Sequence, residues 1–396
     1  MVGAGFATLR RVSSLADPSE LPARLRALPA GAALLRALGD HPGVHLVGGA
    51  VRDLLLGREP RELDVVVEGD ATALALEVDP GAVVHERFGT ASARVEGHAV
   101  DLATARRERY PAPGALPEIE PAGLEEDLLR RDVAINALAV GLADGRLRQA
   151  PGALDDLAAG RLRVLHDASF VDDPTRLHRV ARYAARLGFE LEEHTAALAA
   201  GAVRGGALTT VSGPRVGAEL RLAAGEPKSL AALGWMERLG LLRAPVCAPD
   251  AIRAARSLLG GEGRPDLLAL GGWGVDGERL GFTAAERAVL DRLVDAPEIA
   301  AAALGADRPS QVHAVLGVEP VEAVALAGAL GAGEAARLYL DELRHVRLSI
   351  TGDDLLAAGI ASGPDVGRRL RAALAARLDG TIPAGHEPEL AAALSA

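Results

Sequence analysis

The stretch LVGGAVRDLLLGREPRELDVVVEGD, residues 46–70, decides how the first part of this chain folds. An apolar run ends at Gly48 and Gly49, and the segment after it has helical spacing and closes on Gly57. This pattern predicts a strand, a tight turn and a helix. Backbone N–H groups at such a helix start attract phosphate, and Arg52 adds a fixed positive charge. The pattern also suits glycines needed only for the turn and an arginine on a solvated face.

Two carboxylates stand one residue apart in the next apolar run, ELDVVV, residues 62–67. Side chains of a strand alternate between its faces, so we expect Glu62 and Asp64 on one face and Leu63 on the other. Like charges that close repel each other, and Mg²⁺ with oxygen ligands is the natural partner for both. Without an ion, Glu62 would be a surface residue of an edge strand and Asp64 a turn acid.

A third acid, Asp101, lies in the predicted strand HAVDLAT, residues 98–104, between Val100 and Leu102. Three acids from two adjacent strands can hold two divalent ions. In nucleotidyl transfer one ion lowers the pKa of the attacking hydroxyl, and the other stabilises the leaving pyrophosphate. We therefore predict Glu62, Asp64 and Asp101 as catalytic residues and Mg²⁺ ligands.

Outward from this stretch, a helical run near residues 21–38 precedes a region of short strands and turns that extends to about residue 150. Its strand signals are VHLVGG, ELDVVVEG, GAVVHERFG, ASARVEG, HAVDLAT and NALAVGL. Beyond residue 150 the strand signals fade, and helical segments punctuated by Gly and Pro follow. We predict an α+β chain with a head at residues 1–150, a helical neck at 151–215, and a helical body and tail at 216–396.

The composition fits a globular protein of 396 residues whose core is mainly Leu, Ala and Val, because only 3% of residues are aromatic. The single cysteine, Cys247, excludes an internal disulfide framework and a multi-cysteine zinc site. The first 22 residues lack the apolar core of a secretion signal, and no run of eighteen apolar residues occurs without a charge. We expect a cytoplasmic protein that does not enter a membrane.

The formal net charge of −11 argues at first against a polyanionic partner. The positive charge is nearly all arginine, however, and Lys228 is the only lysine. Arginines cluster at residues 105–110, 128–132 and 176–188. These clusters are more informative about an anionic partner than the total charge is.

The segment SFVDDPTRLHRVARYAARLGFE, residues 169–190, predicts a helix that starts with Asp173 as N-cap and Pro174 as its first residue. An apolar face carries Leu177, Val180, Ala184 and Leu187, and a neighbouring face carries Arg176, Arg179, Arg182 and Arg186. A solvated arginine face is one interpretation. In the other, Asp173 and Arg176 offer an acceptor and a forked donor to a base edge, while the later arginines bind triphosphate.

The segment LEEDLLRRDVAINALAV, residues 124–140, joins a polar helix to an apolar strand. Its acids at residues 125–127 precede Arg130 and Arg131 at helical spacing, which is adequate for internal ion pairs. Arg131 could also reach a nucleotide.

These segments together resemble the class II tRNA nucleotidyltransferases, the CCA-adding enzymes, and their bacterial poly(A) polymerase relatives in the polymerase β superfamily. The resemblance covers most of residues 44–190. It rests on LVGGAVRDLLLG, ELDVVVEGDA, VDLATARRERYPAPGALP, LEEDLLRRDVAINALAV and FVDDPTRLHRVARYAARLGF, in the family's order. The segment ITGDDLLAAGIASGPDVGRRLRAAL, residues 350–374, resembles the family's tail less specifically.

The resemblance implies a polymerase-β-like head, a nucleotide-selecting neck, and a body and tail that bind tRNA. It implies Mg²⁺-dependent, template-free addition of C, C and A from CTP and ATP to a tRNA 3′ end. Gly49 and Arg52 would contact phosphates of the nucleotide, and Asp173 and Arg176 would pair with its base. The whole implied nucleotide site is Gly49, Arg52, Arg131, Asp173, Arg176, Arg179 and Arg182. Residues 106–123 would be the flexible loop that takes part in the switch from C to A.

Two departures from the family pattern bear on activity. Glu62 stands where the family usually has aspartate, and RRDVA, residues 130–134, lacks the Phe and Thr or Ser that commonly follow the acid. A displaced ligand can cost much of the rate. Addition of CC only, A only or poly(A) stays open, as does a weakened homologue that only binds tRNA or nucleotide. A helical interaction protein with a vestigial head is a third reading, and the oligomeric state is open.

Overall fold

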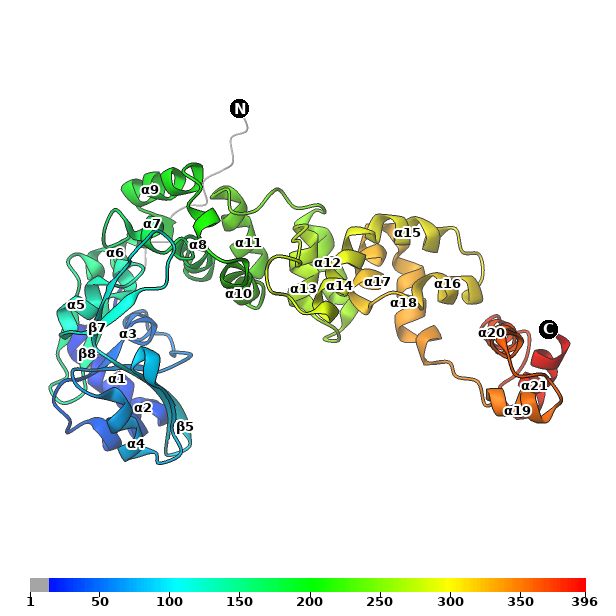
Figure 1. Ribbon diagram of the computed structural model, residues 1–396, viewed down its shortest axis with the longest axis horizontal. Coiled ribbons are helices and arrows are strands. Elements are labelled where there is room, and N and C mark those ends of the chain that lie inside the picture. The colour runs from blue at the N-terminus through cyan, green and yellow to red at the C-terminus, as the bar shows by residue number, and fades with distance from the viewer. Residues whose placement is uncertain (1–13) are drawn as a thin grey trace. The chain divides into compact units, whose positions relative to one another are not determined.

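The computed structural model describes residues 14–396, which form two compact units (Figure 1). The first unit contains residues up to 219 and residues 226–242, and the second contains residues 220–225 and 243–396. Most of the segment that we judged for a secretion signal lies outside the described residues. Over the described range, no helix is both long and apolar enough to cross a membrane.

A seven-stranded mixed sheet forms the centre of the first unit, in the order β3-β4-β5-β2-β1-β8-β9. β2 and β5 are parallel, and the other neighbours are antiparallel. The strands are β1 (Val44–Val47), β2 (Asp64–Val67), β3 (Val83–His85), β4 (Thr90–Val95), β5 (His98–Thr104), β8 (Leu138–Gly141) and β9 (Leu147–Gln149). Each of the six predicted strand segments contains one of these strands, and the predicted α+β class is confirmed.

The helical run predicted near residues 21–38 is two helices, α1 (Leu21–Ala27) and α2 (Pro29–Leu38). The break lies at Leu28, whose backbone is extended with ψ 135°, because the ring of Pro29 disfavours a helical conformation in the residue before it. α3 (Gly49–Leu55) and α4 (Ala71–Val78) follow β1 and β2 in the chain.

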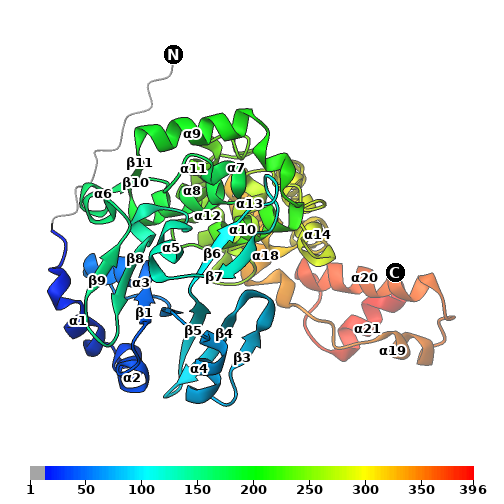
Figure 2. The ribbon, with the colours of Figure 1, turned by 60° about the vertical axis from the view of Figure 1, so that its left-hand side comes forward.

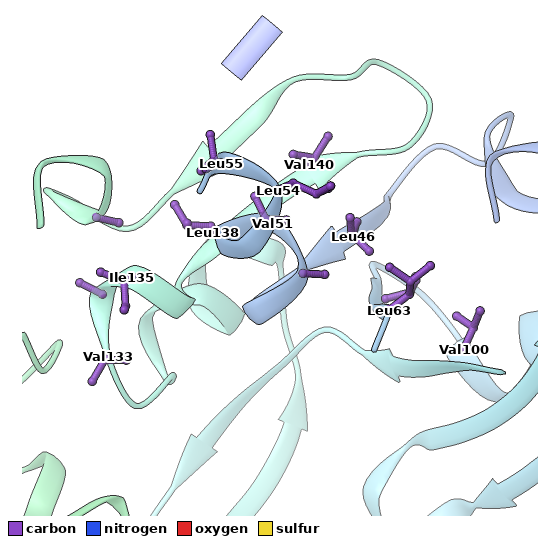
Figure 3. Packing of buried hydrophobic residues seen from close by; sticks show 14 of the residues in the cluster. Leu46, Val51, Leu54, Leu55, Leu63, Val100, Val133, Ile135, Leu138 and Val140 are labelled. Carbon is purple, nitrogen blue, oxygen red and sulfur yellow. The ribbon is translucent and has the colours of Figure 1, made fainter. Parts of the chain in front are cut away.

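Apolar side chains from β1, α3 and β8 pack into one core (Figure 3). Leu46 of β1, Val51 and Leu55 of α3, and Leu138 of β8 are fully buried. The i, i+4 pair Val51 and Leu55 presents one face of α3 to the sheet, as its helical spacing predicts. This packing holds the turn between β1 and α3 in a fixed position.

Three features of the first unit were not predicted as strands. Residues 106–123, expected as a flexible loop, contain an antiparallel hairpin of β6 (Arg106–Arg109) and β7 (Glu118–Pro121). β9 extends the sheet at its edge, and β10 (Arg161–Leu162) pairs in parallel with β11 (Glu190–Leu191) inside the region expected to be helical. These strands are two to four residues long, too short for a period-2 pattern to be distinctive.

Helices make up the rest of the first unit (Figure 2). They are α5 (Leu124–Leu129), α6 (Ala153–Ala159), α7 (Ser169–Asp172), α8 (Arg176–Leu187), α9 (Glu193–Arg204), α10 (Gly213–Ala224), whose last turn belongs to the second unit, and α11 (Ser229–Arg238). Short 3₁₀ helices are η1 (Pro18–Glu20), η2 (Glu86–Phe88), η3 (Ala134–Asn136) and η4 (Ala207–Thr210). α8 packs against α11, and its four predicted apolar residues are buried, which confirms the apolar face.

The remainder of the second unit is helical. It contains α12 (Pro249–Leu259), α13 (Pro265–Gly272), α14 (Ala284–Val294), α15 (Ala296–Leu304), α16 (Pro309–Leu316), α17 (Val321–Ala327), a π-helical turn η5 (Gly328–Ala332), α18 (Gly333–Asp341) and η6 (Leu343–His345). The tail helices are α19 (Gly352–Ala357), α20 (Pro364–Leu378) and α21 (His386–Ser395). The tail has its own small core, centred on Leu355 and Ala373.

Candidate nucleotidyl-transfer site

The turn between β1 and α3 leaves room for two guanidinium groups. Gly48 has φ 70° and ψ −133°, a conformation that side chains disfavour. A Cβ on Gly48 would lie 3.0 Å from Nη1 of Arg131, and one on Gly49 would lie 3.3 Å from Nη2 of Arg52. The glycines therefore let Arg52, predicted to bind phosphate, and Arg131, predicted for the nucleotide pocket, lie against the backbone of the turn.

Arg52 is 2% exposed, so the solvated-face interpretation of this residue is wrong. Its Nε donates to Oδ1 of Asp53 at 2.8 Å, and its Nη1 donates to Oδ1 of Asn136 at 2.6 Å. A buried arginine keeps its charge and needs such acceptors. The two acceptors fix its guanidinium beside Gly49.

Asp64 and Asp101 are direct neighbours across the parallel pair β2–β5. Glu62, in contrast, lies outside the strand in an exposed bend, so its predicted place on the β2 strand is wrong. The last ladder pair between β1 and β2 is Val47 with Asp64, because the chain turns into α3 after Val47. Residues before Asp64 consequently have no β1 partner.

The predicted metal ligands affect the pKa of Asp64. Burial raises the pKa of Asp64, the Glu62 carboxylate raises it further, Arg131 lowers it, and Asp101 raises it. Asp101 accepts a hydrogen bond from Oγ of Ser92 at 2.5 Å. Like charges beside a half-buried carboxylate favour a bound cation.

The chemistry of these donors fits Mg²⁺, which prefers carboxylate oxygens. Within residues 14–396, however, no three side chains of the His, Cys, Asp and Glu types form a preassembled metal site. The convergence of Glu62, Asp64 and Asp101 on one ion therefore stays a prediction.

Arg131 offers a free donor beside the turn. Its Nη2 donates to Oδ2 of Asp127 at 2.9 Å, while its buried Nε has no hydrogen-bond partner among the described residues. Arg130 also donates to Asp127, at 2.7 Å, so the ion pairs predicted within this segment are present. Burial disfavours the charge on Asp127, but Arg131 and Arg130 keep its pKa below the ordinary value.

A buried network that sequence reasoning missed connects the turn to α8. Asn136 accepts from Arg52 and donates through Nδ2 to Oδ1 of Asp132 at 3.2 Å. Asp132 in turn accepts from Nε of Arg179 at 2.8 Å and from the hydroxyl of Tyr183 at 2.9 Å. Burial opposes ionisation of Asp132, yet Arg179 and these hydrogen bonds hold its pKa well below the usual range. The only signal in the sequence is the acid directly after Arg131.

Arg176 is also buried, with 4% of its surface exposed, and its donors meet protein acceptors. Nη1 donates to Oγ of Ser169 at 2.8 Å, and Nη2 donates to the carbonyl of Arg130 at 2.8 Å. Nη2 also lies 3.3 Å from the hydroxyl of Tyr110, at the end of the β6–β7 hairpin's first strand. The predicted base contact of Arg176 is untested by this arrangement.

The helix predicted to start at Asp173 starts later. α8 begins at Arg176 with Thr175 as its N-cap, because Asp173 has an extended backbone and Pro174 and Thr175 form a turn. Oδ1 of Asp173 accepts from the backbone N–H of Thr175 at 3.1 Å and from Nη2 of Arg215 at 2.9 Å. Arg215, at the start of α10, was not among the predicted residues, and only its arginine type could have indicated it.

Arg182 lies farther along α8 and is nearly buried. It faces Glu219 at 3.5 Å and Glu226 at 3.6 Å. Its buried Nε has no hydrogen-bond partner in the described part of the chain. The predicted nucleotide-binding residues thus form two groups, one at the β1–α3 turn and one at Asp173 and on α8, and Asn136 with Asp132 joins them.

Comparison with known proteins identifies relatives of this chain. Residues 44–163 match the family model of the poly(A) polymerase head domain. The chain is 36% identical to an A-adding tRNA nucleotidyltransferase of Geobacter sulfurreducens, over 88% of this chain but 45% of that protein. It therefore spans less than half the length of that relative.

A CC-adding tRNA nucleotidyltransferase of Deinococcus radiodurans is also 36% identical, and this match covers 90% of the present chain and 91% of the relative. Among solved structures, a Thermotoga maritima CCA-adding enzyme complexed with tRNA aligns with a TM-score of 0.74 and 28% identity. That alignment covers 97% of this chain and 99% of the other. The similarity thus extends well beyond the head domain.

Proposed function

Because the chain belongs to the class II tRNA nucleotidyltransferase family, we propose that it adds C, C and A from CTP and ATP to the 3′ end of tRNA without a template. The observation that carries the proposal is the register that pairs Asp64 with Asp101 beside the turn occupied by Arg52 and Arg131. It combines carboxylates for a metal with cations for phosphate.

In the proposed reaction the 3′-hydroxyl of tRNA loses its proton to solvent, and its oxygen bonds to the α-phosphorus of the nucleotide. The bond between the α-phosphorus and the oxygen that bridges to the β-phosphate breaks, and pyrophosphate leaves. Asp64, Asp101 and Glu62 would hold Mg²⁺, which when bound supplies Lewis-acid stabilisation of the developing charge. Arg131, whose Nη1 lies nearest the Gly48 turn, and Arg52 would bind the phosphates of the nucleotide.

Nucleotide selection is proposed for Asp173 and Arg176, with Arg179 and Arg182 behind them. Oδ1 of Asp173 already has donors, whereas its other oxygen accepts no hydrogen bond from residues 14–396 and could accept one from a base. Arg176 can reach a base only if a contact with Tyr110 or with the carbonyl of Arg130 opens. We assign selection to a neck at residues 151–215 and tRNA binding to residues 216–396.

Identity to relatives does not choose among CCA, CC and A addition, since an A-adding and a CC-adding relative are equally similar. The presence of residues 106–123 supports addition of A, because the family resemblance links this segment to the switch from C to A. The test gives one labelled nucleotide at a time, with Mg²⁺, to tRNAs ending in -N, -NC and -NCC. Incorporation of C on the first two and A on the third is expected. No incorporation by folded protein would reject the proposal.

A binding-only homologue is the second candidate, because Glu62 replaces the usual aspartate. The Glu62→Asp variant discriminates between the two. Activity that appears only in the variant would favour the binding role. Activity in both proteins supports the enzyme.

A further inference from the structure

A charged pocket of about 250 Å³ lies beside α3, on the first unit. Three segments line it: the end of α3 with the loop after it, the end of α8, and the loop before α11. Its cations are Arg58, Arg61, Arg186 and Lys228. Arg61 directly precedes Glu62, so the pocket adjoins the proposed metal ligands along the chain.

Three acids also line the pocket, and two of them are already engaged by arginine. Asp53 lies between Arg52, at 2.8 Å, and Arg186, at 3.5 Å. Glu226 is 8% exposed and pairs with Arg61 at 3.1 Å and with Arg186 at 4.0 Å. The buried acids therefore orient cations and have little charge left to repel an anion.

The rim of the pocket offers unused positive charge. Arg58 is exposed, and its side chain has no hydrogen-bond or ion-pair partner within residues 14–396. Lys228 is exposed as well, and within that range its side chain makes one hydrogen bond, from Nζ to the carbonyl of Arg186 at 3.3 Å, and no ion pair. Burial, followed by the nearby charges of Arg52 and Arg61, lowers the pKa of Arg186. An anion in the pocket would relieve this repulsion among cations.

The size and lining of the pocket limit what it can bind. Pockets that enclose a drug-sized ligand measure about 300–1,000 Å³ and have mainly apolar walls. This one is smaller, and among the described residues that line it Pro227 is the only apolar one, so its walls are mainly charged. Within residues 14–396, Glu59 is the only lining carboxylate without an ion-pair partner, which leaves little to attract a cation. A single phosphate group fits these walls best.

We propose that this pocket binds a backbone phosphate of the RNA strand whose 3′ end is extended, with Arg58 and Lys228 as its outer contacts. The inference rests on the proposed function for the identity of the RNA. The phosphate chemistry is shared with CTP and ATP, so the test must separate the two sources.

The unique lysine makes the test direct. Pyridoxal 5′-phosphate forms an imine with the Lys228 amine and releases water, and borohydride then reduces the imine to a stable secondary amine. Peptide mapping by mass spectrometry locates the label. Labelling is measured with EDTA present, so that no transfer occurs. Three samples are compared: the protein alone, the protein with a tRNA that lacks CCA, and the protein with CTP and ATP.

We expect the tRNA to protect Lys228 and the nucleotides to leave it reactive. Arg58→Ala should weaken tRNA binding about tenfold and reduce the slope of log affinity against log salt by about one. Arg24→Ala is the control: it removes an arginine of α1 that pairs with Glu20. It should leave the tRNA affinity and the salt slope unchanged.

The proposal is overturned if tRNA that binds the protein fails to protect Lys228, or if Arg58→Ala behaves like Arg24→Ala. Protection by nucleotides alone would also overturn it, because the phosphate would then come from the nucleotide. Protection by tRNA in a protein that adds neither C nor A would keep this site and reject the proposed enzyme activity.

Discussion

Arg215 joins the acid proposed to read the base to the tip of the β6–β7 hairpin. Its Nη2 donates to Oδ1 of Asp173 at 2.9 Å, and its Nη1 donates to the carbonyl of Gly114 at 2.7 Å. These two acceptors lie 59 residues apart in the chain. One side chain thus holds both the hairpin tip and the proposed selector.

Arg215→Ala should remove the contacts that hold the hairpin tip and the Asp173 carboxylate. A hydrogen bond to a charged partner contributes about 1.5–3 kcal/mol, so discrimination of CTP and ATP against UTP and GTP should fall at least about tenfold. The ratio of kcat/KM values for the four nucleotides measures this effect. Cleavage by a protease within residues 110–117 should become faster. Arg215→Lys keeps the charge but loses the two-pronged contact, and should be intermediate. Unchanged ratios in both variants would contradict the role.

Asp64→Asn and Asp101→Asn should each lower kcat by at least about 10²-fold, since they remove a charged ligand from the proposed metal site. Single-turnover incorporation of labelled CTP measures the loss. Asp70→Asn provides a control: Asp70 caps α4 and is exposed, so its change should affect stability slightly and leave the rate unaltered. Equal rates in the three variants would refute the assignment.

Asp132→Asn should destabilise the first unit by about 1.5–3 kcal/mol, because it removes the nearer carboxylate from Arg179, whose side chain is 37% exposed and keeps Glu219 at 3.8 Å. Tyr183→Phe removes only one hydrogen bond to the same carboxylate and should cost about 1 kcal/mol. Urea denaturation followed by circular dichroism gives both values. Similar losses in the two variants would show that the Asp132–Arg179 ion pair stabilises the fold no more than the Tyr183 hydrogen bond does.

His178 should make stability depend on pH below neutrality. Burial lowers the pKa of His178 to about 4, from an ordinary value of 6.5. Between these values the unfolded chain binds a proton that the folded chain does not. The contribution of neutral His178 to the free energy of unfolding is therefore complete above pH 6.5. It is lost as the pH falls toward 4, by up to about 1.4 kcal/mol per pH unit.

His178→Gln removes this titration. The difference in unfolding free energy between the variant and the natural protein should be constant above pH 6.5 and should shift in favour of the variant below it. Urea denaturation at several pH values measures the difference. Parallel stability curves from pH 7 to 4.5 would contradict the assignment.

Local spacing in the sequence determined much of this molecule. The glycine turn, the six strand segments and the apolar face of α8 followed from residues two to four positions apart, because strand and helix geometry relates such neighbours directly. The candidate acids and arginines were found in the same way. Three features were not predicted in this way, since they depend on how segments meet in the folded chain. They are the strand start at Asp64, the helix start at Arg176 and the hairpin at residues 106–121.

Tertiary structure alone decided the partners of the charged groups. Asp64 is opposite Asp101 because β2 and β5 are parallel in one register, and Arg215 reaches Asp173 across 42 residues. The arginines of α8 have carboxylate partners within the protein, such as Asp132 and Glu219, and are not on a freely solvated face. Their contact with a nucleotide stays a prediction. Periodicity indicates which face a side chain lies on, whereas packing between distant segments determines what that face meets.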